Sequence, residues 1–267
     1  MYRELLVTLA LACLTIAALI VVGSQGWQGT ADMCVDGDQC FCERDRGGLI
    51  RTPANTLSNV GFIMAGLGIA LGIGFERGRG RHPRAGNLMT ETSFYPGFYA
   101  CIVTLLGPAS MALHGSLMSW GGVLDIISMN FFIGFLLAYA LQRLYHLDRS
   151  GFIAIWLGVN AVLGALKLIV GRGSEAFGVV AVIVFLAELR IRRAGHVRAD
   201  GRWMMLGAGL FLLAFVIWLP SGNGGPLCDP DSLLQGHAAW HFLCAGATVA
   251  LYCYARSERI FAPVTPN

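Results

Sequence analysis

The sequence has few charged residues. They make up 13% of its 267 residues, and lysine occurs once, at Lys167. Soluble globular domains carry roughly 25% charged residues, so this composition argues against a soluble protein. No polar stretch is long enough to build a core of its own, while apolar runs of about 20 residues, the length that crosses a bilayer, recur along the chain. We therefore predict one integral membrane domain.

The apolar runs predict an all-α integral membrane protein with eight transmembrane helices. The expected spans are 5–23, 56–75, 97–114, 121–142, 152–170, 175–189, 203–220 and 236–254. The expected organisation is an additional N-terminal transmembrane helix (1–23), an extracytoplasmic cysteine-containing loop (24–55), a seven-helix catalytic core bundle (56–255) and a cytoplasmic tail (256–267). A signal peptide is the alternative for residues 1–23. The run is long for one and no A-x-A cleavage site follows, so we favour an uncleaved helix.

Arginine is distributed unevenly over the predicted loops. One set of alternate loops and tails holds 14 of the 18 arginines, and the other set holds only Arg44, Arg46, Arg51 and Arg172. Positively charged loops stay in the cytoplasm, so both termini are expected there. The loops 24–55 and 221–235 are then extracytoplasmic. The protein is expected in a membrane, and the arginine-rich, lysine-poor composition suggests the inner membrane of a GC-rich bacterium.

Polar residues from four predicted helices fall at the outer ends of those helices. They are Asn55, Ser58 and Asn59, then Ser110 and His114, then Asp125, and finally His237 and His241. Ionisable groups in membrane segments are rare and usually functional. Residues four apart share a helix face, which pairs His237 with His241 and Ser110 with His114. We expect a tight turn through Gly115, Gly121 and Gly122 to return Asp125 to the depth of His114.

Three imidazoles, one carboxylate and one hydroxyl are the components of a hydrolytic zinc site. Each residue has an ordinary alternative, since a lone histidine often caps a helix and a lone serine often bonds a helix carbonyl. Their shared depth favours the metal site. We predict His114, His237 and His241 as zinc ligands. Asp125 would act on the zinc-bound water, and Ser110 would stabilise the oxyanion.

Four cysteines lie in the extracytoplasmic loops: Cys34, Cys40, Cys42 and Cys228. An oxidising compartment favours two disulfides, for which three pairings exist. Cys42 and Cys228 each lie shortly before a helix that supplies residues to the outer-face site. We therefore predict a Cys42–Cys228 bridge, which leaves Cys34 with Cys40.

The ordered motifs resemble those of the alkaline ceramidase family, and the chain would be a bacterial member of it. Ser110-x-x-x-His114, Asp125 and His237-x-x-x-His241 are similar to its site motifs. Cys42-Glu43, Asn55-Thr56-Leu57-Ser58-Asn59 and Gly236-His237-Ala238-Ala239-Trp240-His241 resemble its C-E, N-T-x-S-N and H-A-x-W-H elements. The family belongs to a wider superfamily of seven-helix membrane hydrolases that includes adiponectin-type receptors. The likeness covers about residues 40 to 255.

This resemblance implies seven core helices around a Zn²⁺ ion and cleavage of the amide bond of ceramides, giving a fatty acid and a sphingoid base. A membrane lipid is the expected substrate, and no nucleic-acid partner is expected. It also implies a Ca²⁺ site, for which only Glu43 and Asp45 match. Cys40 stands where an aspartate is expected, and Thr52 or Ala54 where a glutamate is expected. Because calcium needs several oxygen ligands, we expect this site to be weak.

Two other functions remain open from the sequence. One is a related zinc lipid hydrolase that acts on esters or on non-sphingoid amides. The other is a seven-helix receptor or transporter whose metal is structural. A closed site with four protein ligands would favour the structural role, and an open metal position would favour a hydrolase.

Overall fold

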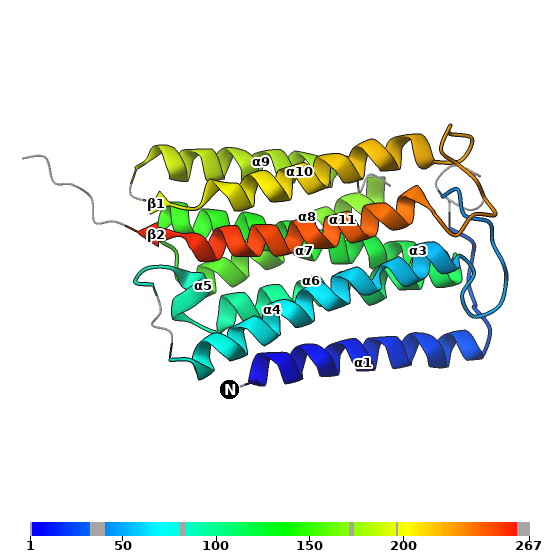
Figure 1. Cartoon of the computed structure of the whole chain (residues 1–267), viewed down its shortest axis with the longest axis horizontal. Helices are drawn as coiled ribbons and strands as arrows, with labels where there is room; N and C mark the ends of the chain where they lie inside the picture. The colour runs from blue at the N-terminus through cyan, green and yellow to red at the C-terminus, as the bar shows by residue number, and fades with distance from the viewer. Residues whose placement is uncertain (1, 33–40, 81–83, 171–173, 196, 261–267) are drawn as a thin grey trace, which may run out of the picture.

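The computed structural model describes residues 2–32, 41–80, 84–170, 174–195 and 197–260. The described chain is all-α apart from one pair of two-residue strands, and its long helices lie side by side along the long axis (Figure 1). The elements are α1 (Arg3–Ser24), α3 (Pro53–Ser58), α4 (Val60–Gly78), α5 (Leu88–Glu91), α6 (Phe94–Ser116), α7 (Ser119–Tyr145), α8 (Arg149–Val170), α9 (Ser174–Arg193), β1 (Val197–Arg198), α10 (Gly201–Trp218), a 3₁₀ turn (Leu219–Ser221), α11 (Gly236–Ser257) and β2 (Arg259–Ile260).

Seven segments of the described chain are long and apolar enough to cross a membrane. They are α1, the combined α3–α4 segment, α6, α7, α8, α10 with the turn that follows it, and α11. This confirms an all-α protein with membrane-spanning helices. The N-terminal helix is one of these seven, so the expected arrangement of seven core helices plus one more is met only in part.

Of the eight predicted spans, 175–189 is the one that is not among these seven candidate membrane helices. It forms α9, which is 20 residues long but carries Glu188, Arg190, Arg192 and Arg193 in its last turns. The helix still packs against α7, where Val180 contacts the cluster that contains Ile133. Length alone would let α9 cross a bilayer, since 20 residues span about 30 Å. Its terminal charges are what separate it from the other seven helices.

Helix α1 is an integral part of the bundle. Its buried positions Glu4, Thr8 and Ala12 recur every four residues and therefore form one face, which packs against α4 and α6. The Arg77 guanidinium bonds the Glu4 carboxylate at 2.8 Å. The Thr8 hydroxyl lies 3.8 Å from the Cys101 sulfur. The remaining faces of α1 expose leucine and valine, as expected for a helix that faces lipid.

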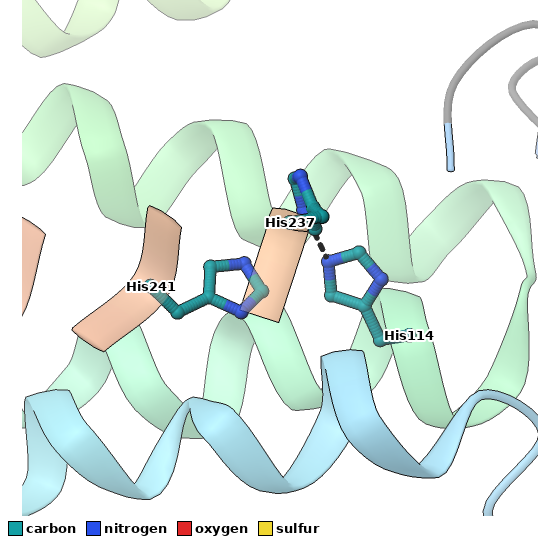
Figure 2. A group of neighbouring side chains, drawn as sticks. All are labelled: His114, His237 and His241. Carbon is teal, nitrogen blue, oxygen red and sulfur yellow. Dashed lines mark hydrogen bonds between the residues drawn. The ribbon is translucent and has the colours of Figure 1, made fainter. Parts of the chain in front are cut away.

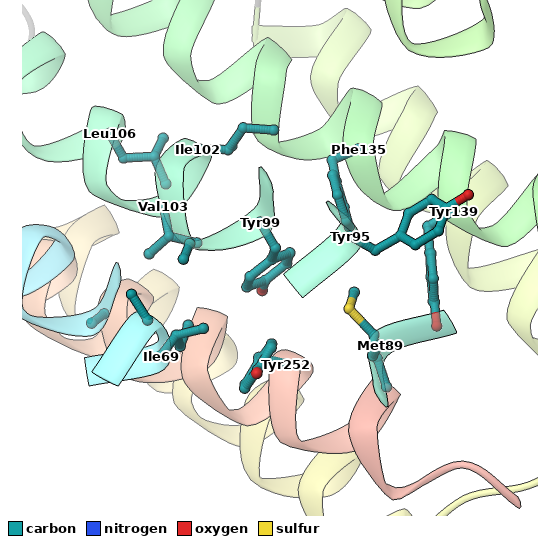
Figure 3. Packing of buried hydrophobic residues seen from close by; sticks show 14 of the residues in the cluster. Ile69, Met89, Tyr95, Tyr99, Ile102, Val103, Leu106, Phe135, Tyr139 and Tyr252 are labelled. Carbon is teal, nitrogen blue, oxygen red and sulfur yellow. The ribbon is translucent and has the colours of Figure 1, made fainter. Parts of the chain in front are cut away.

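An aromatic core holds the central helices in register. Tyr99 of α6 lies between Phe135 of α7 and Tyr252 of α11, with ring centroids 5.2 and 5.7 Å away (Figure 3). Its hydroxyl donates to the Thr248 carbonyl of α11 at 2.7 Å. A buried hydroxyl with a partner avoids the cost of a lost hydrogen bond. This contact fixes α6 against α11, the two helices that carry the histidines.

The two ends of the bundle differ in character. α5, β1 and β2 lie at one end, and α3 lies at the other (Figure 1). At the strand end, β1 pairs with β2 in antiparallel register, Val197 opposite Ile260. There the Arg143 guanidinium bonds the carboxylates of Glu188 and Glu258 and so joins α7, α9 and the chain after α11. Arg77, Arg143 and Arg190, in the last turns of α4, α7 and α9, lie at this end.

The turn between α6 and α7 is built differently from the prediction. Leu117, with φ of 56°, ends α6, and Met118 leads directly into α7. Gly121 and Gly122 lie inside α7, so the predicted glycine turn is wrong. A Cβ at Gly121 would come within 2.6 Å of the Ala112 carbonyl oxygen. The glycine therefore allows close approach of the two helices, and the turn itself needs no glycine.

Candidate metal centre

Three histidines converge at the end of the bundle that carries α3. His114 lies in the last turn of α6, and His237 and His241 lie in the first two turns of α11. The Nε2 atoms of His114 and His237 are 3.2 Å apart, and one ring nitrogen from each of the three lies within 4.8 Å of the others (Figure 2). The predicted convergence of these residues is confirmed.

Hydrogen bonds at the end of α6 hold His114 in place. The backbone N–H and the hydroxyl of Thr52 both donate to the His114 carbonyl, at 3.2 and 2.7 Å. The Arg51 N–H donates to the Gly115 carbonyl at 3.1 Å. The last carbonyls of a helix have no partner within the helix, so these bonds supply the missing donors. The segment that leads into α3 therefore fixes the end of α6 on which His114 lies.

The hydrogen bonds of Ser58 favour one tautomer of the neutral His241 imidazole. Its hydroxyl lies 2.7 Å from His241 Nδ1 and 2.9 Å from the Asn55 carbonyl. A hydroxyl has one proton, and the carbonyl can only accept, so Ser58 donates to Asn55 and accepts from Nδ1–H. The neutral ring then carries its proton on Nδ1. Nε2 is left with a free lone pair, as a metal ligand requires.

The separation of the two facing histidine nitrogens is compatible with two ligands of one tetrahedral metal ion such as zinc. Nitrogens that each lie about 2.0–2.1 Å from one zinc in a tetrahedral site are about 3.3–3.4 Å apart, close to the 3.2 Å between His114 and His237. The group contains three ligands and no fourth among the described residues. A metal ion held by these three side chains alone would keep one tetrahedral position open, as in catalytic sites.

Ser110 and Asp125 lie together, next to the histidine-bearing end of α6. Ser110 is one turn before His114 on the same face of α6, and Asp125 lies in the second turn of α7. The Ser110 hydroxyl is within hydrogen-bonding reach of the Asp125 carboxylate. Their proximity agrees with the sequence prediction, and their catalytic roles remain predictions.

A second carboxylate, that of Asp32, approaches Asp125 from the segment that follows α1. Its N–H donates to the Leu117 carbonyl at 3.0 Å, so the segment crosses the α6–α7 turn. A Cβ at Gly122 would lie 2.1 Å from Asp32 Oδ2, which places that carboxylate one turn from Asp125 on α7. The sequence analysis missed Asp32, because this contact depends on the path of that segment.

The remaining polar residues predicted at this end are buried in α3 and at its end. Asn55, Ser58 and Asn59 are each at most 2% exposed, and the Asn59 amide donates to the Asn55 carbonyl at 2.8 Å. Neither side-chain atom of Asn55 has a partner among the described residues. A buried amide without partners is costly, so Asn55 has bonding capacity for a water or a substrate.

The Cys42–Cys228 bridge is present, as predicted. It joins the segment before α3 to the loop before α11. Cys34 and Cys40 lie outside the described residues, so their pairing stays a prediction. Beside the bridge, the Phe41 ring packs against His114 and His237. No sequence pattern marked Phe41, since it is a single aromatic residue in a loop.

The two carboxylates of the predicted calcium site already have partners within the chain. Glu43 accepts the N–H groups of Ala54 and Asn55 at 2.8 and 2.7 Å and so caps α3. Asp45 pairs with Arg51, whose guanidinium together with the Gly47 N–H holds the pKa of that carboxyl below its usual value. These carboxylates have structural roles that need no ion, and calcium binding stays an untested expectation.

No protein-family model matches this chain, and no curated protein matches it. The fold and the site therefore define its class. It is an all-α membrane protein with seven candidate spanning helices and a buried histidine group that could bind a metal ion.

Proposed function

We propose that this protein is a zinc-dependent hydrolase that cleaves the amide bond of ceramide-like membrane lipids, releasing a fatty acid and a sphingoid-type amine. The observation that carries the proposal is the facing pair of His114 and His237 Nε2 atoms, 3.2 Å apart, with His241 completing the group. Ser110, one helical turn before His114 on α6, lies within hydrogen-bonding reach of Asp125 on α7. The motif resemblance to alkaline ceramidases supplies the expected substrate class.

The residues around the histidines fit hydrolysis of an acyl bond. Zinc, when bound, would lower the pKa of a nearby water and stabilise negative charge on the substrate carbonyl oxygen. Asp125 would accept a proton from the attacking water and return it to the amine nitrogen as the C–N bond breaks. The Ser110 hydroxyl would donate to the Asp125 carboxylate while that group is ionised. Once Asp125 carries the proton from the water, the Ser110 hydroxyl would be free to donate to the carbonyl oxygen as it becomes negative.

The position of the site supports a lipid substrate. The histidines lie at one end of helices that are long enough to cross a bilayer, so the site would lie near the membrane–water boundary. There a lipid can keep its chains in the apolar layer while its amide reaches the ligands. Arginine in the opposite connections supports a cytoplasmic location for that end, which would put the site on the extracytoplasmic side.

The test is direct hydrolysis by the purified, zinc-loaded protein in lipid nanodiscs. A long-chain N-acyl sphingosine and a diacylglycerol with the same acyl chain are incubated separately, and free fatty acid and amine are measured by mass spectrometry. Release from the amide, lost in Asp125→Asn, is the expected result. Release from the ester alone would favour the related ester hydrolase. No release from either lipid would contradict the proposal and favour a structural metal.

A further inference from the structure

Phe41 packs directly on two of the three histidines. Its ring centroid lies 4.6 Å from that of His114, with the planes at 73°, and 4.5 Å from that of His237, with the planes at 53°. Aromatic rings at such separations are in contact. These are the same two histidines whose Nε2 atoms face each other. Phenylalanine has no ligand atom, so its role at the site is not metal binding.

The residues that follow Phe41 are anchored on two sides. Cys42 is bonded to Cys228 in the loop before α11. The Glu43 carboxylate accepts the N–H groups of Ala54 and Asn55 at the start of α3. The Arg44 N–H donates to the Pro230 carbonyl at 3.0 Å. Three consecutive residues thus tie this segment to elements that flank the histidines, which fixes where the ring of Phe41 lies.

An apolar ring against the ligands of a metal controls how water reaches that metal. The apolar surroundings of a site set its solvent access and its local dielectric. The Nδ1 atoms of His114 and His237, the two imidazoles that Phe41 contacts, are buried. The Phe41 ring covers one side of these two imidazoles, and the chain leads from it directly into the bridged Cys42.

We propose that Phe41 is an apolar cover of the metal centre, held in place by the Cys42–Cys228 disulfide, and that it shields the ligands from the aqueous phase. Resting on the proposed function, this cover also favours lipid substrates over water-soluble amides. The ring would obstruct solutes that approach from the outer loops and leave lipids that approach from the bilayer unaffected. Phe41 acts through the histidines and touches no reacting atom.

The first test measures metal loss, which requires no catalysis. Zinc-loaded full-length protein in nanodiscs is mixed with excess chelator, and zinc release is followed over time. Phe41→Ala should release zinc roughly 10-fold faster or more, while Phe41→Leu, which keeps an apolar side chain, should stay near the original rate. Release from Phe41→Ala at the unchanged rate would overturn the proposal.

A control and a check on folding accompany that test. Trp27 is an aromatic residue of the same outer segment that packs on Trp120, 6.0 Å away between centroids. Trp27→Ala should therefore leave the release rate unchanged. Zinc affinity at equilibrium, measured by competition, should change little in Phe41→Ala, because all three ligands remain. Equal acceleration by Trp27→Ala would show general loosening of the outer segment and would contradict a specific cover.

The disulfide is tested by non-additivity. The double variant Cys42→Ser/Cys228→Ser keeps Phe41 but loses its anchor, so it should also release zinc faster. Adding Phe41→Ala to that variant should give little further acceleration if both changes remove the same cover. If the two effects multiply, the disulfide and Phe41 act independently, and the proposed anchoring is wrong.

The proposed preference for lipid substrates over water-soluble amides is tested with one amide of each kind. The ratio of turnover on a short-chain, water-soluble N-acyl amine to turnover on the long-chain lipid should rise in Phe41→Ala. An unchanged ratio would overturn the selectivity role while leaving the shielding result standing. If the original protein hydrolyses neither amide, the proposed hydrolase function fails, and the zinc-release experiments still decide whether Phe41 covers the metal.

Discussion

The Ser58 hydroxyl lies 2.7 Å from Nδ1 of His241 and donates its own proton to the Asn55 carbonyl. This relationship makes Ser58 the group that keeps Nε2 of His241 free for a metal. It also gives α3 a role in the site, although α3 carries none of the three histidines.

Ser58→Ala should weaken zinc binding by roughly 10–100-fold, the usual effect of removing a residue that orients a metal ligand. Zinc affinity by competition with a chelating dye measures the effect. Ser116→Ala is the matched control, since Ser116 is a buried serine at the same end whose hydroxyl donates to the Ala112 carbonyl and accepts from the Met118 N–H. Equal affinities in Ser58→Ala and the original protein would contradict the assigned proton position.

Changing His114, His237 or His241 to alanine should remove zinc and activity together, because each supplies one of three ligands. Zinc content by elemental analysis, measured beside turnover, checks this. His146→Ala provides the control, since His146 ends α7 at the opposite end of the bundle and should keep both. A histidine variant that retains full zinc content would remove that residue from the ligand set.

Asp125→Asn should keep its zinc and lower turnover by about 10²–10⁴-fold, the scale of general acid–base catalysis. Ser110→Ala should also keep zinc, with a loss of about 10²–10³-fold, the scale of an oxyanion donor. The same two measurements separate these roles. Loss of zinc from Asp125→Asn would make the aspartate a ligand or a structural residue, and full turnover would place the base elsewhere.

Cysteine labelling tests which end of the bundle faces outward. Gln25→Cys, exposed beyond the end of α1, should react with an impermeant maleimide on intact cells. Ala194→Cys, exposed beyond the end of α9 at the strand end, should react only after permeabilisation. The expectation follows from the arginine distribution. The reverse pattern would place the histidines on the cytoplasmic side.

Glu258 predicts a pH-dependent stability. Burial raises the pKa of its carboxyl to about 7, although Arg143 opposes the shift. A carboxyl whose pKa rises on folding contributes stability below its unfolded value, near 4.5, and that contribution is lost as the pH rises through about 7. The melting temperature of the original protein should therefore decrease as the pH rises from about 5 to about 8.

Glu258→Gln should remove part of that dependence, because the amide stays neutral at both pH values while keeping the size of the side chain. Its melting temperature at the higher pH should exceed that of the original protein. Glu91→Gln, at an exposed carboxylate of α5, serves as the control and should leave the melting temperature unchanged at both the lower and the higher pH. Identical pH profiles for Glu258→Gln and the original protein would show that Glu258 does not titrate in this window.

The long helices were predictable because hydropathy alone determines them. Because His114, His237 and His241 lie at the same end of the predicted helices, they could be expected to meet. Cys42 and Cys228 each lie shortly before a helix that begins there, which predicted their bridge. Each of these inferences needs only the position of a residue along a helix or next to one. Span 175–189 was harder, since charges in its last turns remove α9 from the apolar set.

Contacts that depend on irregular backbone could not be predicted. Phe41 reaches the histidines because the Cys42–Cys228 disulfide, the Glu43 cap of α3 and a backbone hydrogen bond from Arg44 fix the path of a loop. Asp32 reaches Asp125 by crossing the α6–α7 turn. That turn is set by the positive φ of Leu117, which no pattern marks in a leucine. In each case the deciding interactions join residues far apart in sequence, and the loop residues themselves carry no periodic signal.

The histidine ligands also constrain when the protein can acquire its metal during synthesis. His114 and His237 are 123 positions apart, and the bridged cysteines Cys42 and Cys228 are 186 apart. A nascent chain inserted only as far as α10 holds one ligand and one unpaired half of the bridge. A metal held by all three histidines could therefore load only after α11 is inserted, and the bridge could form only after Cys228 has emerged, so a shorter intermediate would lack the proposed centre.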